Sequence, residues 1–142
     1  MKVDKKSLFL SVGICLLPIL IGVYYYDVLP EQISIHFNFK GEPDNFVSKT
    51  RAIIDIPIFL AIVQVIISLV VDFDKTPKKG AFIIKGIIPL ISVLVQGGVI
   101  AYALDNNFNV SQLAIFVIGI VLIILGNYLP KKEFWGKYNF NL

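Results

Sequence analysis

Long apolar runs, separated by short clusters of charged residues, dominate the pattern of this chain. Four of the runs have about the 20 residues that a helix needs to cross the hydrocarbon core of a bilayer, and they cover residues 7–26, 52–71, 83–104 and 112–129. Apolar side chains surround each predicted helix on all sides, as expected where lipid replaces water. The pattern therefore predicts an all-α integral membrane protein, in which a four-helix transmembrane bundle forms a single domain over residues 1–142.

The segment between the first two runs, residues 28–51, has a different pattern. Residues 33–39 alternate strictly between apolar and polar side chains, which is the period of a strand with one buried face. The residues expected to face the lipid headgroups or the bundle are Ile33, Ile35, Phe37 and Phe39, and those expected to face outward are Ser34, His36 and Asn38. Glycine and Pro-Asp in residues 40–45 indicate a turn, and residues 46–48 form a second short extended piece. We therefore expect a small, hairpin-like outer loop.

Composition narrows the classes of protein that fit this pattern. Charged residues make up 16% of the chain and hydrophobic residues 56%, whereas soluble domains carry roughly a quarter charged residues, so the polar faces of a soluble enzyme domain are missing. The formal net charge of +3 is too small to indicate a nucleic-acid partner. The single cysteine, Cys15, excludes an internal disulfide framework.

Basic residues predict the orientation in the membrane, because they accumulate in cytoplasmic loops. With the N-terminus inside, ten of them lie on the cytoplasmic side and three on the outer side. The cytoplasmic ten are Lys2, Lys5, Lys6, Lys75, Lys78, Lys79, Lys85, Lys131, Lys132 and Lys137, and the outer three are Lys40, Lys49 and Arg51. The first run is longer than the apolar core of a signal peptide and no cleavage site follows it. We interpret it as a retained helix, with both termini of the protein cytoplasmic.

Polar residues inside the predicted spans are few, and they share a face of each helix with proline and small residues. These faces comprise Pro57, Ala61, Gln64 and Ser68 in the second span, and Pro89, Ser92 and Gln96 in the third. Small and amide-bearing side chains on one face are typical of helix–helix contact, and the alternative is a ligand-lined groove in which Gln64 and Gln96 are the intramembrane polar residues. Asp55 follows Arg51 by four residues, which favours a paired interfacial charge over a proton relay.

The outer loop resembles a signature of the SdpI family of bacterial membrane proteins. The matching residues are 29–38 (LPEQISIHFN), 41–44 (GEPD) and 48–49 (SK), followed much later by 126–131 (GNYLPK). The family's loop has leucine-proline, then isoleucine, then His-x-Asn and Gly-x-Pro-Asp. The chain departs from the family after residue 132, where the family continues into a further segment and two helices, so it resembles a shortened member.

The resemblance implies a function in immunity or membrane sensing. It implies a multi-pass protein of the bacterial plasma membrane that protects the cell against a secreted antimicrobial peptide by binding the peptide at the outer face. The toxin-facing loop would comprise His36, Asn38, Gly41, Glu42, Pro43 and Asp44. The family also implies a cytoplasmic repressor as partner, which the shortened C-terminus puts in question. The alternative function is an accessory or transport subunit that packs against a larger membrane protein.

The remaining chemistry does not indicate an enzyme or a cofactor. His36 lies near Glu42 and Asp44 in the sequence, so a metal site is one interpretation, but a histidine that stabilises the loop by hydrogen bonding is favoured over it. Cys15 lies in an apolar run without a basic neighbour, so its thiol is expected to be unreactive. For the basic inner loop, attraction to the anionic lipids of the bilayer is favoured over docking to a cytoplasmic regulator.

Overall fold

The computed structural model describes residues 3–73 and 78–128. In chain order it contains α1 (Lys5–Leu16), α2 (Pro18–Tyr24), β1 (Gln32–Phe37), β2 (Pro43–Ser48), α3 (Lys49–Phe73), α4 (Lys78–Leu104) and α5 (Val110–Tyr128). Within the described residues, four helical segments are long and apolar enough to cross a membrane: Lys5–Tyr24, Lys49–Phe73, Gly80–Leu104 and Val110–Asn127. The predicted fold class, a transmembrane helix bundle with a small outer hairpin, is therefore confirmed, and the chain has the organisation of a multi-pass membrane protein.

Proline divides the first membrane span, which the pattern predicts as one continuous helix. α1 ends at Leu16 and α2 begins at Pro18, because proline has no backbone N–H and its ring clashes with the carbonyl of the preceding turn. The N–H of Leu17 donates to the carbonyls of Gly13 and Ile14, at 3.1 and 3.3 Å, and so closes the last turn of α1. The two pieces still form one span of 20 residues, Lys5–Tyr24.

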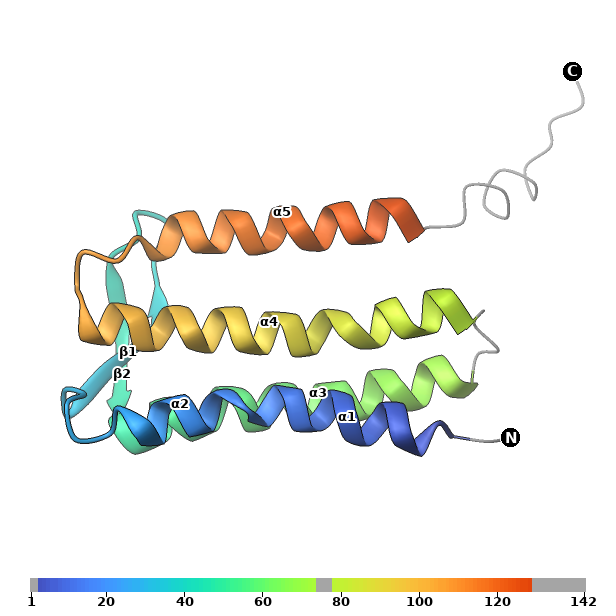
Figure 1. The fold of residues 1–142 in the computed structure, drawn as a ribbon. Helices are drawn as coiled ribbons and strands as arrows, with labels where there is room; N and C mark the ends of the chain where they lie inside the picture. Colours follow the sequence, from blue (N-terminus) through green and yellow to red (C-terminus); the bar gives the residue numbers. More distant parts are fainter. Residues whose placement is uncertain (1–2, 74–77, 129–142) are drawn as a thin grey trace, which may run out of the picture.

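Three of the spans form the compact part of the bundle. The α1–α2 span, α3 and α4 all pack against one another, whereas α5 packs chiefly against α4 among the described elements (Figure 1). Most of the surface of α5 is exposed, including Ile115, Phe116 and Ile123. The hairpin lies at the end of the bundle where α2 and α4 end and α3 and α5 begin (Figure 1). We call this the hairpin end and the opposite end, which carries the N-terminus of α1, the far end.

The strands form an antiparallel pair whose register differs from the simple alternation expected. Residues Gln32, Ile33 and Ser34 pair with Ser48, Val47 and Phe46, and an irregularity follows between Ser34 and His36. Such a bulge breaks the two-residue alternation of faces. β2 also begins earlier than expected, at Pro43, so the turn is shorter than residues 40–45.

One side chain of the hairpin therefore lies opposite to the prediction, and another lies outside the strand. Ser34, expected to face outward, is 2% exposed, and its hydroxyl donates to the carbonyl of His36 at 2.7 Å across the bulge. Phe39, expected to face the lipid headgroups or the bundle, lies beyond the end of β1 and is fully exposed, so it does not pack on the bundle. Both differences follow from the irregular register, because the bulge and the early end of β1 change which positions reach the bundle.

The hairpin rests on an apolar core at the ends of α3 and α4. Its buried members are Leu29, Ile33, Ala52, Ile53, Val99 and Ile100. Phe37 adds an edge-to-face contact with Tyr102 of α4, with ring centroids 4.9 Å apart. Gly22 of α2 lies so close to Ile53 that an added Cβ would meet its side chain at 2.6 Å. The outer loop is thus a folded part of the bundle and not a linker.

The register gives a direct test with two phenylalanines that the sequence pattern treats alike. Phe37→Ala should lower the free energy of unfolding by about 1.5 kcal/mol, because it removes the aromatic pair with Tyr102 and part of the buried surface. Phe39→Ala should change it by less than about 0.5 kcal/mol, because the side chain is fully exposed. Unfolding in detergent micelles measures both. Equal losses for the two variants would contradict the observed register.

Candidate functional site

Four of the residues expected in the toxin-facing loop form two pairs across the hairpin. His36 Nδ1 lies 2.6 Å from Asp44 Oδ1, and both side chains are open to solvent, at 66% and 43% exposure. The amide of Asn38 donates to Glu42 Oε2 at 2.9 Å. The hairpin therefore presents an imidazole–carboxylate pair and a separate amide–carboxylate pair on its polar surface.

Asn38 and Gly41 shape the turn that holds these pairs. Asn38 Oδ1 accepts hydrogen bonds from the backbone N–H groups of Lys40 and Glu42, at 2.9 and 3.0 Å. Gly41 has a φ of 81°, a conformation that side chains with a Cβ rarely adopt, and an added Cβ would also meet the hydroxyl of Ser111. Pro43 begins β2. These three residues fix the backbone, and His36, Glu42 and Asp44 supply the accessible polar groups.

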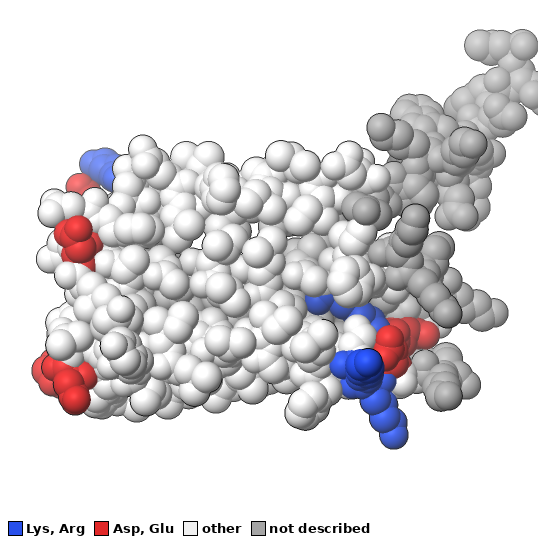
Figure 2. Space-filling view, viewed as in Figure 1, with Lys and Arg blue, Asp and Glu red and all other residues white. Residues whose placement is uncertain are grey.

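The hairpin end is acidic and the rest of the chain is basic. Six carboxylates lie at the hairpin end against three basic groups, which gives this end a net charge of −3. They are Asp27, Glu31, Glu42, Asp44, Asp55 and Asp105 against Lys40, Lys49 and Arg51. The remaining ten basic and four acidic residues of the sequence carry +6. Figure 2 shows the charged groups gathered at the two ends, with an uncharged belt between them.

Some of this charge is neutralised by local pairs near the start of α3. Lys49 Nζ lies 3.0 Å from Glu31 Oε1 and 4.6 Å from the centre of the Tyr26 ring. Arg51 Nε donates to Asp55 Oδ2 at 2.9 Å, within the first turns of α3. These two pairs occupy Lys49 and Arg51. The third basic residue of the hairpin end, Lys40, is the one nearest in sequence to Glu42 and Asp44.

An apolar groove lies beneath the hairpin, between β1, α4 and α5. It has a volume of about 310 Å³. Its walls include Ile35 and Phe37 from β1, Val99 from α4, and Leu113 and Val117 from α5. His36 lines its edge, so the polar surface of the hairpin and the apolar groove meet at this residue. An amphipathic ligand would find both kinds of surface there.

Inside the bundle, Gln64 satisfies a carbonyl that a proline leaves free. Pro89 has no N–H to donate to the carbonyl of Lys85, four residues before it. The amide of Gln64 on α3 donates to that carbonyl at 2.9 Å and to the hydroxyl of Ser68 at 3.0 Å. Gln64 is fully buried. This contact shows how α4 continues through Pro89, since a neighbouring helix replaces the lost hydrogen bond.

Gln96 and Ser92 make the matching contacts further along α4. The amide of Gln96 donates to the carbonyl of Ala52 on α3 at 2.8 Å, and the hydroxyl of Ser92 donates to the carbonyl of Cys15, in the last turn of α1, at 2.8 Å. Among the described residues, the buried side-chain oxygens without a hydrogen-bond partner are Gln64 Oε1 and Gln96 Oε1. The two glutamines are not neighbours; each joins α3 to α4 at a different depth.

The far end contains an ion pair that the sequence pattern did not predict. Lys85 Nζ lies 2.6 Å from Asp72 Oδ1, with the two side chains 5% and 12% exposed. The second oxygen of Asp72 accepts the backbone N–H of Asp4 at 3.0 Å, which ties the start of α1 to the pair. The sequence does contain a signal for this pair. Asp72 follows the second apolar run and Lys85 lies at the start of the third. Opposite charges at the ends of neighbouring spans are expected to pair, because an unpaired charge within a span is costly.

The structure does not assemble the candidate metal ligands into one group. His36 contacts Asp44, but the carboxylate of Glu42 is bonded to Asn38 instead. Among the residues that the structure describes, no three His, Cys, Asp or Glu side chains are grouped to hold a metal ion. The residues after 128, including Lys131, Lys132 and the C-terminus, lie outside the described part, and so does much of the 126–131 motif.

One comparison with known proteins gives a match. Residues 13–61 match a protein family described as Domain of unknown function (DUF1648). The matched region runs from the last turn of α1 through the hairpin to the middle of α3, so it contains all of the paired residues on the polar surface of the hairpin. No curated protein matches the chain, and neither does any solved structure.

Proposed function

We propose that this protein is a bacterial membrane immunity or sensing protein that binds a cationic, membrane-active peptide at its hairpin end. The observation that carries the proposal is the joint presence, at one edge of the hairpin, of the His36–Asp44 and Asn38–Glu42 pairs and an apolar groove. Membrane-active peptides are typically amphipathic helices with a basic face and an apolar face. Such a peptide would match both surfaces together.

The two surfaces have different roles in this proposal. The net charge of −3 at the hairpin end would raise the local concentration of a cationic peptide and speed its encounter with the protein. The apolar groove of about 310 Å³ would then accept one or two of its apolar side chains. A peptide held there would be unavailable for insertion into the bilayer. The similarity of residues 29–38 and 41–44 to the SdpI-family signature supports the same function.

The proposal requires the hairpin end to face the outside of the cell, with the N-terminus cytoplasmic. Two lysines at opposite ends of the described structure give a matched test: Lys40 in the turn and Lys6 in α1 are both exposed. In intact cells, Lys40→Cys should react with a membrane-impermeant maleimide and Lys6→Cys should react only after lysis. The native Cys15 is fully buried and provides the background. Labelling of Lys6→Cys in intact cells would overturn the orientation.

The charge of the hairpin should determine the protection. The double variant Glu42→Gln, Asp44→Asn keeps acceptors for Asn38 and His36 but removes two charges from the polar surface. A sensitive bacterium expressing it should lose most of the protection that the parent protein gives against a synthetic amphipathic helix of leucine and lysine, measured as survival at equal membrane abundance. The loss should shrink at high salt, because exposed charges are screened.

A matched control separates a specific surface from the general field of the hairpin end. Asp27→Asn with Asp105→Asn removes the same charge from the same end but outside the hairpin. We expect this control to keep more than about half of the protection, since the groove and both hairpin pairs remain. Equal losses for the two double variants would reduce the role of the hairpin to non-specific attraction. No protection by the parent protein would reject the proposal.

The alternative function, an accessory or transport subunit, has less support in this fold. This alternative requires small-residue faces that are free to pack against a larger membrane protein. The central members of those faces, Ala61, Ser68 and Ser92, are buried inside the chain's own bundle. The alternative would place function at Gln64 and Gln96, so it predicts that Gln64→Leu or Gln96→Leu abolishes activity while the hairpin variants have no effect.

A further inference from the structure

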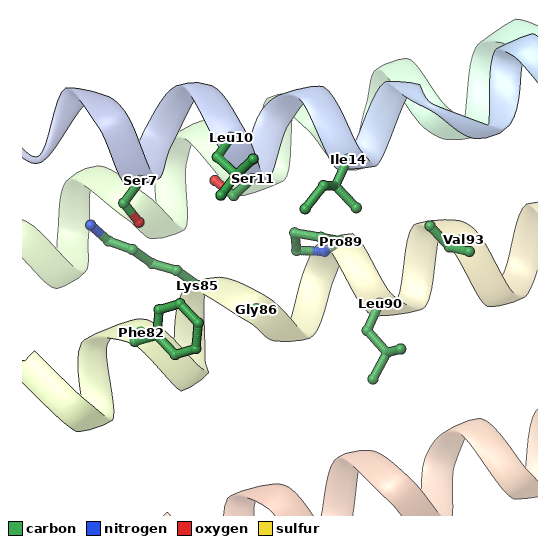
Figure 3. A pocket seen from close by; sticks show the side chains of 10 residues that line it. All are labelled: Ser7, Leu10, Ser11, Ile14, Phe82, Lys85, Gly86, Pro89, Leu90 and Val93. Carbon is green, nitrogen blue, oxygen red and sulfur yellow. The ribbon is translucent and has the colours of Figure 1, made fainter.

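A second apolar groove lies between α1 and α4, at the far end of the bundle. It has a volume of about 350 Å³. Figure 3 shows Ile14 of α1 facing Pro89 of α4 across it. Leu10 of α1 and Phe82 and Leu90 of α4 also line the groove. The groove has room because residue 86 is a glycine: a Cβ added there would meet nothing within 4 Å. This groove is separate from the hairpin site, so a ligand bound in it does not depend on the proposed immunity function.

Polar groups are confined to one end of this groove. Figure 3 shows Ser7 beside the end of the Lys85 side chain. Ser11 also lines the groove, but its hydroxyl donates to the carbonyl of Leu8 in its own helix at 3.0 Å and is therefore already bonded. The groove thus has an apolar length and a single polar end formed by Ser7 and Lys85.

The polar end can bind an anion. The Lys85 side chain is 5% exposed and its ammonium group contacts Asp72 Oδ1. An ammonium group has three N–H donors, so this contact leaves donors for a second acceptor. The other oxygen of Asp72 accepts the N–H of Asp4. Lys5 and Lys6, exposed at the start of α1, add two positive charges next to Ser7, against one carboxylate, that of Asp4, which accepts the N–H of Ser7 at 3.1 Å.

We propose that this groove binds an anionic phospholipid from the leaflet at the far end of the bundle. One acyl chain would lie along Leu10, Ile14 and Pro89, and the phosphate would accept hydrogen bonds from Ser7 and Lys85. The charge complementarity selects an anionic headgroup over a neutral one, and basic segments of this kind favour anionic lipid surfaces. A lipid bound in this position contacts both α1 and α4, so it stabilises the bundle by mass action.

Filling the groove tests this assignment without breaking the ion pair. Gly86→Leu places a side chain in the groove, and Gly119→Leu, on α5, is the matched control, because an added Cβ at either glycine meets nothing within 4 Å. The full chain in detergent is titrated with phosphatidylglycerol, and binding is followed by native mass spectrometry and by the lipid-dependent shift in the unfolding midpoint. Phosphatidylcholine with the same acyl chains and inorganic phosphate are titrated in parallel.

The parent protein and Gly119→Leu should bind phosphatidylglycerol alike, and Gly86→Leu should bind it about tenfold more weakly, which corresponds to about 1.4 kcal/mol. Lys5→Gln with Lys6→Gln should weaken phosphatidylglycerol binding and leave phosphatidylcholine binding unchanged. Undiminished binding by Gly86→Leu overturns the site. Equal binding of phosphatidylcholine overturns the anionic headgroup, and equal stabilisation by inorganic phosphate overturns the role of the acyl chain.

Discussion

Replacing Lys85 with methionine is expected to lower the free energy of unfolding by about 3–5 kcal/mol, because it leaves the carboxylate of Asp72 buried without its counter-charge. The side chain of Asp72 is 12% exposed, so water screens the charge only weakly. The loss should appear as a lower midpoint in denaturation by sodium dodecyl sulfate from mixed micelles, or as low membrane abundance in cells.

A double variant shows whether the loss comes from the unpaired charge or from missing packing. Asp72→Asn in the Lys85→Met background removes the buried charge but keeps an oxygen that can accept the N–H of Asp4. We expect the double variant to regain most of the lost stability, since replacing both members of a buried pair is often close to neutral. A double variant as unstable as Lys85→Met would mean that the packing of the lysine chain, and not its charge, holds the far end together.

The sequence predicted the spans well and the partners of individual polar groups poorly. A span depends on the hydropathy of about 20 consecutive residues, which is a local property. The basic bias groups Lys85 with the cytoplasmic lysines, yet its side chain lies buried against Asp72. The basic bias across the membrane predicts on which side a lysine lies but not whether it is paired, and the pairing depends on how α3 packs against α4.

The hairpin shows the same limit at the level of strands. The alternation over residues 33–39 correctly predicted a strand, but the outward face predicted for Ser34 was wrong, and Phe39 lies beyond the end of the strand. The bulge between Ser34 and His36 arises from pairing with β2, and the first residues of β2, Pro43 to Asn45, look like turn residues when read alone. His36 and Asp44 are eight residues apart in the sequence, and their contact joins β1 to β2. The geometry of this contact therefore depends on the same register.

Gln64 is the position where a local signal does predict a long-range partner. Proline at 89 frees the carbonyl at 85, and a polar side chain at the same depth of a neighbouring helix can satisfy it, as the 2.9 Å contact from Gln64 shows. Gln64→Leu should therefore lower the free energy of unfolding by about 2 kcal/mol, the usual cost of a buried carbonyl left without a donor. Denaturation in mixed micelles measures this loss.

A double-mutant cycle with Pro89 isolates the cause of that loss. Pro89→Ala restores an N–H that can donate to the carbonyl of Lys85 within α4. In this background Gln64→Leu should cost less than about 1 kcal/mol, because the carbonyl then has a donor from its own helix. The coupling between the two positions should thus be about 1 kcal/mol or more, as expected for groups that share one acceptor.

Gln96 provides the control, since its amide donates to the carbonyl of Ala52 and not to the carbonyl of Lys85, which Pro89 leaves without a donor. Gln96→Leu should cost the same with proline or alanine at 89, and a cycle in which both glutamines couple equally to Pro89 would show that the proline acts through the general shape of α4.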